Sequence, residues 1–257
     1  MDRQPFVAGN WKMNTNAQDG RSLVEALVAE AGSETGATMA VCPPFVYLSA
    51  IAEIIADSNI ALGAQNMCSE DKGAFTAEVS PHMLTDCGCD YVIVGHSERR
   101  HIYGETDAMV NAKVHKALEV GLKPIVCVGE TLKEREQDRT MSVIERHVAW
   151  GLYGLSSEQA LQVTVAYEPV WAIGTGKVAE PEDANAVHAF IRGILGKTFG
   201  EENAAQMRIQ YGGSVKESNV ERLSEMTDID GFLVGGASLK AAEFAQIIKK
   251  AVKVKSG

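Results

Sequence analysis

The chain has 257 residues, of which 46% are hydrophobic and 23% charged, an ordinary globular composition with ample material for a core. Its formal net charge of −10 argues against general binding to nucleic acid or to anionic membranes, but not against a local positive pocket for a small anion. No apolar run approaches the roughly 18 residues of a membrane-spanning helix, so we expect no membrane segment.

Strand-like runs recur along the chain between longer stretches that have the apolar spacing of amphipathic helices. Leu23, Leu27 and Ala31 show this spacing near the start, and residues 244–251 show it near the end. The runs that predict strands are Phe6–Asn10, Thr38–Cys42, Ile60–Gln65, Tyr91–Val94, Pro124–Val128, Val163–Tyr167, Arg208–Tyr211 and Gly231–Val234.

Eight strand-then-helix units in roughly 250 residues are typical of a closed (β/α)8 barrel, the TIM-barrel class of α/β fold, with eight parallel strands each followed by a helix. A doubly wound open sheet is the structural rival, but it would normally use fewer strands and carry a glycine-rich fingerprint after the first. Asn10, Trp11 and Lys12 follow the first strand and form no such fingerprint. No linker rich in Gly, Pro or Ser interrupts the units, so we expect residues 1–257 to form a single domain.

In such a barrel the residues that follow the strands share one face, and active sites lie there. The polar residues at these positions are therefore expected to meet at one mouth. They are Asn10 and Lys12 after the first strand, Gly95, His96, Ser97 and Glu98 after the fourth, Glu168 after the sixth, Gly212, Gly213 and Ser214 after the seventh, and Gly235 and Gly236 after the eighth.

Glu168 closes the sixth strand run, Pro169 stops it, and a segment with Gly174 and Gly176 follows. Proline fixes one end of this segment, and glycine adopts backbone angles that other residues avoid, which is typical of a mobile lid. A carboxylate beneath a lid is a candidate general base, and burial would raise its pKa towards the useful range. The alternative is a strand end followed by an ordinary turn.

Two glycine pairs predict a phosphate site. Gly212 and Gly213, followed by Ser214, come after the seventh strand, and Gly235 and Gly236 come after the eighth, the usual position of a phosphate site in such barrels. Without Cβ atoms, backbone N–H groups approach an anion closely, although either pair alone could be a tight turn. The chain has no Gly-x-x-x-x-Gly-Lys loop, so nucleoside triphosphate binding has little support.

Lys12 is the only cation expected close to this phosphate site, where it would clamp an anionic substrate, and Asn10 could hydrogen-bond to it or to the substrate. Taken alone, Lys12 would be a surface lysine. His96 begins a predicted helix whose positive end disfavours the imidazolium, so a neutral ring could donate to a developing oxyanion. The alternatives are a capping or solvent-exposed His96, and a Glu98 that is either a second acid or a helix-start carboxylate.

The cysteines and histidines predict no metal site. Cys87 and Cys89 have the wrong spacing for a zinc hairpin, and the histidines have no metal-ligand spacing. Cys42 and Cys127 lie in apolar strand runs, where buried reduced thiols are expected, and this predicts a reducing cytoplasm. The first four residues lead directly into a predicted strand, so we expect no signal peptide.

Enolisation next to the carbonyl of a small phosphorylated sugar needs a base, a neutral electrophile, a cation and a phosphate-binding site, and the predicted residues supply all four. A lid would protect the labile enediol phosphate. Two rival classes stay open. One is another phosphate-binding barrel enzyme, such as an aldolase or a sugar-phosphate isomerase, although an aldolase would need a strand-end Schiff-base lysine and the strand ends supply only Lys12. The other is a non-catalytic barrel.

At these same residues the chain resembles the triosephosphate isomerase family. The matching segments are Gly9-Asn10-Trp11-Lys12-Met13-Asn14, Val94-Gly95-His96-Ser97-Glu98-Arg99-Arg100, Ala166-Tyr167-Glu168-Pro169-Val170-Trp171-Ala172-Ile173-Gly174-Thr175-Gly176, Tyr211-Gly212-Gly213-Ser214-Val215 and Leu233-Val234-Gly235-Gly236-Ala237-Ser238-Leu239. The resemblance runs in order along nearly the whole chain, and together the segments are highly specific.

The resemblance implies interconversion of dihydroxyacetone phosphate and D-glyceraldehyde 3-phosphate through an enediol(ate), in glycolysis and gluconeogenesis, without cofactor or metal. It implies Glu168 as the base, His96 as the electrophile, and Asn10 and Lys12 as substrate contacts.

The resemblance also implies supporting roles for Glu98 and Cys127. The backbone N–H groups of Gly174, Ser214 and Gly236 would hold the phosphate.

A homodimer through the loop after the third strand, here Gln65 to Val79, is likewise implied, with Thr76 near a tip that enters the neighbouring subunit. This loop of about 15 residues has no helix or strand pattern and is unusually long. Met67 and Phe75 suit a contact surface better than a solvent-exposed loop. The family usually has glycine where this chain has Ala77, and a positive φ there would cost alanine about 1 kcal/mol.

Overall fold

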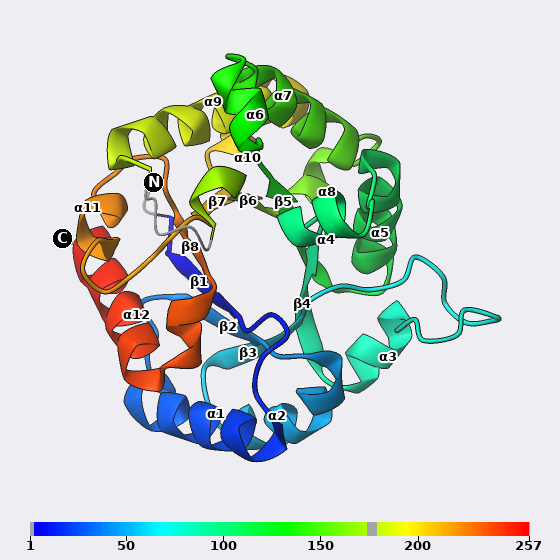
Figure 1. Ribbon diagram of the computed structural model, residues 1–257, viewed down its shortest axis with the longest axis vertical. Coiled ribbons are helices and arrows are strands. Elements are labelled where there is room, and N and C mark those ends of the chain that lie inside the picture. The colour runs from blue at the N-terminus through cyan, green and yellow to red at the C-terminus, as the bar shows by residue number, and fades with distance from the viewer. Residues whose placement is uncertain (1–2, 174–178, 257) are drawn as a thin grey trace.

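A closed barrel of parallel strands, ordered β1 to β8 around the ring, forms the centre of the computed structural model, which describes residues 3–173 and 179–256 (Figure 1). The strands are β1 (Phe6–Asn10), β2 (Thr38–Cys42), β3 (Ile60–Ala64), β4 (Cys89–Val94), β5 (Lys123–Val128), β6 (Thr164–Tyr167), β7 (Arg208–Tyr211) and β8 (Gly231–Val234). Phe6 closes the ring, because it lies opposite Thr38 of β2 on one side and Gly231 of β8 on the other. The predicted (β/α)8 barrel is therefore confirmed.

Helices surround the barrel on all sides in Figure 1. The α-helices are α1 (Ala17–Ala31), α2 (Leu48–Ile55), α3 (Pro81–Asp86), α4 (Ser97–Ile102), α5 (Asp107–Glu119), α6 (Leu132–Glu136), α7 (Thr140–Gly151), α8 (Ser157–Ala160), α9 (Pro181–Phe199), α10 (Glu201–Ala204), α11 (Val220–Ser224) and α12 (Ala241–Lys255). Short 3-10 helices are η1 (Phe45–Tyr47), η2 (Val170–Ala172) and η3 (Gly236–Leu239). Every strand precedes an α-helix as predicted, and β4, β5 and β6 each precede more than one.

Successive side chains of a strand point alternately into the barrel and out towards the helices, and this divides the core into two parts. Phe6 and Ala8 of β1 belong to a buried cluster with Ile93, Cys127 and other strand residues inside the barrel. Val7, between them, belongs instead to the larger cluster between the barrel and its helices. Small side chains such as Ala8 allow eight strands to share one interior, and the layer they form is the floor of the site described below.

The predicted helix faces are buried. Leu27 and Ala31 of α1 are buried and Leu23 packs against the core from the same face. On α12, the predicted positions 244, 247, 248 and 251 are all buried, and the two helices pack side by side. The spacing of the apolar residues therefore correctly predicted which face of each of these two helices is buried.

Four strand boundaries differ from the prediction by one or two residues. β3 ends at Ala64, one residue earlier than predicted, and the side chain of the next residue, Gln65, donates to two backbone carbonyls. β4 begins at Cys89, where it pairs with Leu62 of β3. β5 begins one residue earlier than predicted and β6 one residue later.

Loop 65–79 projects away from the barrel between β3 and α3 and contains no helix or strand (Figure 1). Phe75 is 45% exposed, as expected of a contact surface, whereas Met67 is fully buried in the core of its own chain. The prediction that Met67 contributes to a contact surface was therefore wrong. Ala77 has φ of 77°, so the position does require the left-handed conformation.

Replacing Ala77 with glycine should raise the free energy of unfolding by about 0.5–1 kcal/mol. Relief of about 1–2 kcal/mol of left-handed strain exceeds the roughly 0.4–1 kcal/mol that glycine costs through the freedom of the unfolded chain. Urea unfolding of Ala77→Gly checks this, with Ala26→Gly on the exposed face of α1 as the matched control. The free energy of unfolding of the control should fall by about 0.5–1 kcal/mol. An equal fall in both variants would contradict the inference that the backbone at Ala77 is strained.

Candidate active site

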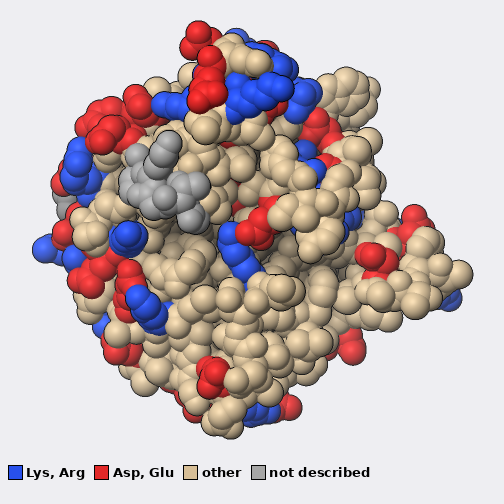
Figure 2. Space-filling view, in the orientation of Figure 1, with Lys and Arg blue, Asp and Glu red and all other residues tan. Residues whose placement is uncertain are grey.

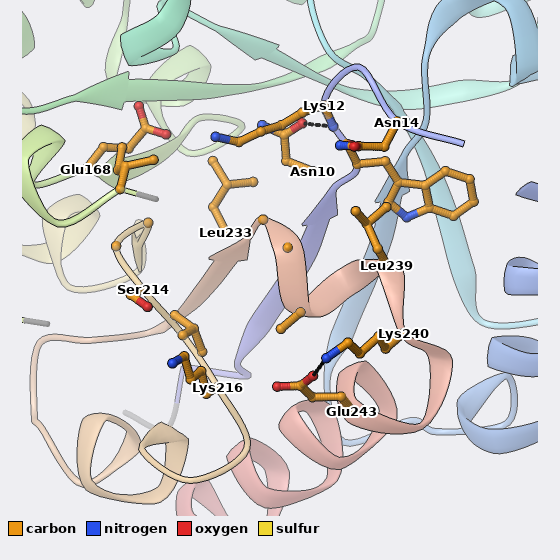
Figure 3. Close-up of a pocket in the computed structure, with 18 of the residues that line it drawn as sticks. Asn10, Lys12, Asn14, Glu168, Ser214, Lys216, Leu233, Leu239, Lys240 and Glu243 are labelled. Atoms are coloured by element: carbon orange, nitrogen blue, oxygen red, sulfur yellow. Dashed lines mark hydrogen bonds and ion pairs between the residues drawn. The ribbon is translucent and has the colours of Figure 1, made fainter. Parts of the chain in front are cut away.

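A cavity of about 550 Å³ opens where the strands end, and Figure 2 shows it as a hollow near the centre of this face. Strand-end residues that were expected at one mouth line it together. They are Asn10, Lys12, His96, Glu168, Gly212, Gly213, Ser214, Gly235 and Gly236. Figure 3 shows Lys12 extending across the cavity towards Glu168. The predicted convergence is confirmed for these residues, whereas Gly95, Ser97 and Glu98, which were also expected at the mouth, are not among the residues that line the cavity.

Glu168 is buried at the wall of the cavity, with only 2% of its surface exposed. One carboxylate oxygen lies 2.9 Å from Nε2 of His96, and the other accepts a hydrogen bond of 2.9 Å from the backbone N–H of Ser97. A Cβ on Gly212 would lie 2.9 Å from Cγ of Glu168, so a side chain there would displace the carboxylate. The strand end and the neighbouring glycine thus fix Glu168 at one place.

The pKa of Glu168 is lowered in this site, although burial by itself raises it. The charge and hydrogen bond of His96, the Ser97 N–H and the charge of Lys12 together outweigh the burial. The prediction that burial would raise the pKa of Glu168 overall was wrong, because these neighbours prevail. The carboxylate is consequently ionised, and its lone pairs are held by two donors.

His96 caps α4, and its Nδ1 accepts a hydrogen bond of 3.2 Å from the backbone N–H of Glu98. With Nδ1 as the acceptor, the neutral form of the ring carries its proton on Nε2, facing Glu168. Burial lowers the pKa of His96, but the Glu168 carboxylate outweighs it, and the pKa is raised. The expectation that the helix start disfavours the imidazolium is overridden by this partner.

Lys12 is held in a left-handed conformation with φ of 52°. Its backbone N–H donates to Oδ1 of Asn10 at 3.0 Å, and its Nζ lies 2.6 Å from Oε1 of Glu98. Gln65 donates from Nε2 to the carbonyl oxygens of Lys12 and Cys42, at 2.8 and 2.9 Å. Gln65 was not among the site residues predicted from the sequence, because the direction of its side chain depends on the backbone after β1 and β2.

Cys127 lies beneath Glu168 as a buried free thiol. Burial raises its pKa well above the ordinary value, and the Glu168 carboxylate raises it further. The thiol therefore stays protonated and contributes a compact neutral group to the floor. Cys42, also a free buried thiol with a pKa raised by burial, bears out the same prediction.

The candidate phosphate residues Ser214, Gly235 and Gly236 line the cavity, and Figure 3 shows Ser214 at the end where Lys216 also lies. The backbone N–H groups of Ser214 and Gly236 donate to no acceptor within the described ranges, so they are available to an anion. A Cβ on Gly213 would lie 2.3 Å from the hydroxyl of Tyr211, which explains the glycine there. Gly174, the remaining candidate, falls outside the described residues.

Further charged residues, missed from the sequence, line this end of the cavity. Lys216, Lys240 and Glu243 all contribute to the lining. Lys12 is therefore not the only cation near the candidate phosphate site, and that expectation was wrong. These residues lie a few positions beyond the strand ends, where only the tertiary structure reveals which side chains turn inward.

Glu130 anchors the segment that follows Glu168. It is fully buried, accepts from Nε1 of Trp171 at 2.8 Å and from the hydroxyl of Tyr167, and contacts Arg135 at 3.6 Å. Burial raises the pKa of Glu130. This cluster fixes the chain where it approaches the candidate lid, whose glycines lie outside the described residues.

Within residues 3–173 and 179–256, no group of three or more His, Cys, Asp or Glu side chains is arranged to hold a metal ion. None of the helices described is both long and apolar enough to cross a membrane.

The chain is similar to known proteins over nearly its whole length. A family model described as triosephosphate isomerase matches residues 5–251. A triosephosphate isomerase of Rhodopirellula baltica is 55% identical over 251 residues, which cover 98% of this chain and 99% of the relative. One of Carboxydothermus hydrogenoformans is 54% identical, covering 97% and 100%. One of Herpetosiphon aurantiacus is 53% identical, covering 96% and 99%.

Proposed function

The chain belongs to the triosephosphate isomerase family, and from this premise we propose how its residues carry out the reaction. It is an isomerase that interconverts dihydroxyacetone phosphate and D-glyceraldehyde 3-phosphate. The observation that carries the assignment of roles is the buried pair of Glu168 and His96, whose Oε1 and Nε2 lie 2.9 Å apart at the wall of the cavity.

Glu168 is the general base. Its carboxylate takes the proton from the carbon next to the carbonyl, while Nε2–H of His96 donates to the carbonyl oxygen as negative charge develops there. Glu168 returns the proton to the neighbouring carbon of the enediol(ate), the remaining hydroxyl proton passes through His96 to the former carbonyl oxygen, and the ketose becomes the aldose. No atom is gained or lost, so the reaction requires no external reagent.

Substrate binding makes Glu168 a stronger base. In the described site the donors from His96 and Ser97 lower its pKa. A substrate carbonyl that accepts from His96 withdraws one of these donors, which raises the pKa of Glu168 towards the range suited to proton abstraction. The same step removes the carboxylate that raises the pKa of His96, and so favours the neutral ring.

The phosphate group is held by the backbone N–H groups of Gly174, Ser214 and Gly236, with Gly235 beside them and the charge of Lys12 offsetting the dianion. The N–H groups of Ser214 and Gly236 lie at the lining of the cavity without an acceptor among the described residues, which supports their part of this assignment.

Asn10, Glu98 and Cys127 support the reacting groups. Asn10 and Glu98 hold the backbone and the ammonium group of Lys12, at 3.0 and 2.6 Å. Cys127 packs as a neutral group beneath Glu168. We place the enzyme in the cytoplasm as a single barrel domain.

A coupled assay on triose phosphate tests the function. Full turnover is expected after exhaustive chelation and desalting, because proton transfer between Glu168, His96 and the substrate consumes nothing else. An absolute need for a divalent ion or for nicotinamide, or no isomerisation by the folded protein, would overturn the assignment.

We further propose a homodimer formed through loop 65–79. The loop projects from the barrel (Figure 1), Phe75 on it is half-exposed, and Met13, which follows β1, is 94% exposed. Large apolar side chains of this kind on one face favour an interface.

Light scattering at micromolar concentration should report twice the chain mass of 27.6 kDa. The double variant Phe75→Glu, Thr76→Lys should be monomeric with much lower activity, because it places charges in a desolvated contact. Tyr153→Glu, which changes another exposed aromatic residue, should remain dimeric. A fully active wild-type monomer would refute the interface.

A further inference from the structure

Among the residues that the structure describes, three lysines line the cavity of a chain whose net charge is −10. Lys12 is paired with Glu98 at 2.6 Å, and Lys240 is paired with Glu243 at 3.3 Å. Lys216 forms no ion pair with any carboxylate of the described chain. Among these three lysines, only the ammonium of Lys216 is without a direct ion pair to a described carboxylate, in a protein whose net charge otherwise repels anions.

The backbone of Lys216 is fixed next to the candidate phosphate residues. Its N–H donates to Oδ1 of Asn219 at 2.8 Å, and Nδ2 of the same asparagine donates to the carbonyl of Ser214 at 2.9 Å. Its carbonyl accepts from Val220, the first residue of α11. Figure 3 shows Lys216 beyond Ser214 at the same end of the cavity. A long cationic side chain thus extends from a rigid base at the rim.

We propose that Lys216 is a specificity-determining residue that draws the phosphate dianion of the substrate into the mouth of the cavity and favours phosphorylated over unphosphorylated trioses. The inference rests on the proposed function. Because Lys216 is exposed, its ammonium acts through solvent over about one Debye length, roughly 10 Å at 0.1 M salt. It therefore assists capture of the substrate and leaves the proton-transfer step unchanged.

This role predicts an effect on kcat/KM that depends on ionic strength. At low salt, Lys216→Gln should lower kcat/KM for D-glyceraldehyde 3-phosphate about two- to five-fold, mainly through KM. Near 1 M salt, where the Debye length is about 3 Å, the difference should vanish. Lys216→Arg, which keeps the charge, should match the wild type at every ionic strength.

Lys253→Gln is the matched control. It removes the same charge from an exposed lysine in the last turn of α12, whereas the start of that helix follows the cavity-lining Lys240. This variant should behave as the wild type, and so should both variants with unphosphorylated glyceraldehyde. A Lys216→Gln protein equal to Lys253→Gln at low salt would overturn the proposal, as would a salt-independent loss confined to kcat.

Calorimetric titration with inorganic phosphate separates this inference from the proposed function. Lys216→Gln should bind phosphate about two- to five-fold more weakly than Lys253→Gln at low salt. A wild type without isomerase activity would refute the function, and the titration would still decide on Lys216. Equal phosphate affinities in the two variants would refute the role of Lys216 while leaving the isomerase intact.

Discussion

Glu168→Gln should lower kcat by at least about 10²- to 10⁴-fold, because a carboxamide cannot take the proton from the substrate carbon. The structure adds a cost in stability. Both Nε2 of His96 and the backbone N–H of Ser97 donate to the carboxylate, and the carboxamide has only one oxygen to accept them. We expect a loss of about 1–3 kcal/mol in the free energy of unfolding if the carboxamide keeps this place. Steady-state kinetics and urea unfolding measure the two effects.

Two further variants make the result decisive. Glu168→Asp keeps the carboxylate but shortens the side chain by one methylene group, which moves the base away from the substrate carbon. A misplacement of this size can lower the rate about 10²-fold. Glu243→Gln removes another carboxylate of the same cavity and should retain activity within about tenfold, since its partner Lys240 is an exposed side chain. Near-normal turnover of a folded Glu168→Gln protein would exclude Glu168 as the base.

Lys12→Ala should lower kcat/KM by roughly 30- to 5,000-fold, equivalent to about 2–5 kcal/mol for a desolvated charge contact with the phosphate. Alanine suits this test because, like lysine, it carries a Cβ at φ of 52°, so the backbone strain stays similar and only the side chain is lost. The fall should appear mainly in the binding of substrate and of anionic inhibitors.

Lys240→Ala is the control for the cation. This lysine lines the same cavity but is 74% exposed, so its loss should cost less than about tenfold. An unchanged kcat/KM in Lys12→Ala would place Lys12 among ordinary surface lysines.

Local sequence was sufficient for the architecture and for most of the site. The alternation of strand runs with amphipathic stretches predicted a closed barrel, because side-chain periods of 2 and 3.6 residues are properties of the backbone itself. In a parallel barrel the strand ends share one face, so residues as distant as Asn10 and Gly236 could be assigned to one mouth before any contact was known. Even the risk at Ala77 followed from the chemistry of one position, and its φ of 77° bears it out.

The tertiary structure alone decided the electrostatics. Burial of Glu168 was foreseeable, but the direction of its pKa depends on His96 and on a Ser97 N–H that lies 71 positions earlier in the chain. Such distances follow from how the strands pack around the ring, and an electrostatic effect that varies steeply with distance cannot be read from spacing along the sequence. The same reason explains why Gln65 and Lys216 were missed and why Met67 was wrongly placed on the surface: each side chain's direction is set by neighbours that only the closed barrel brings together.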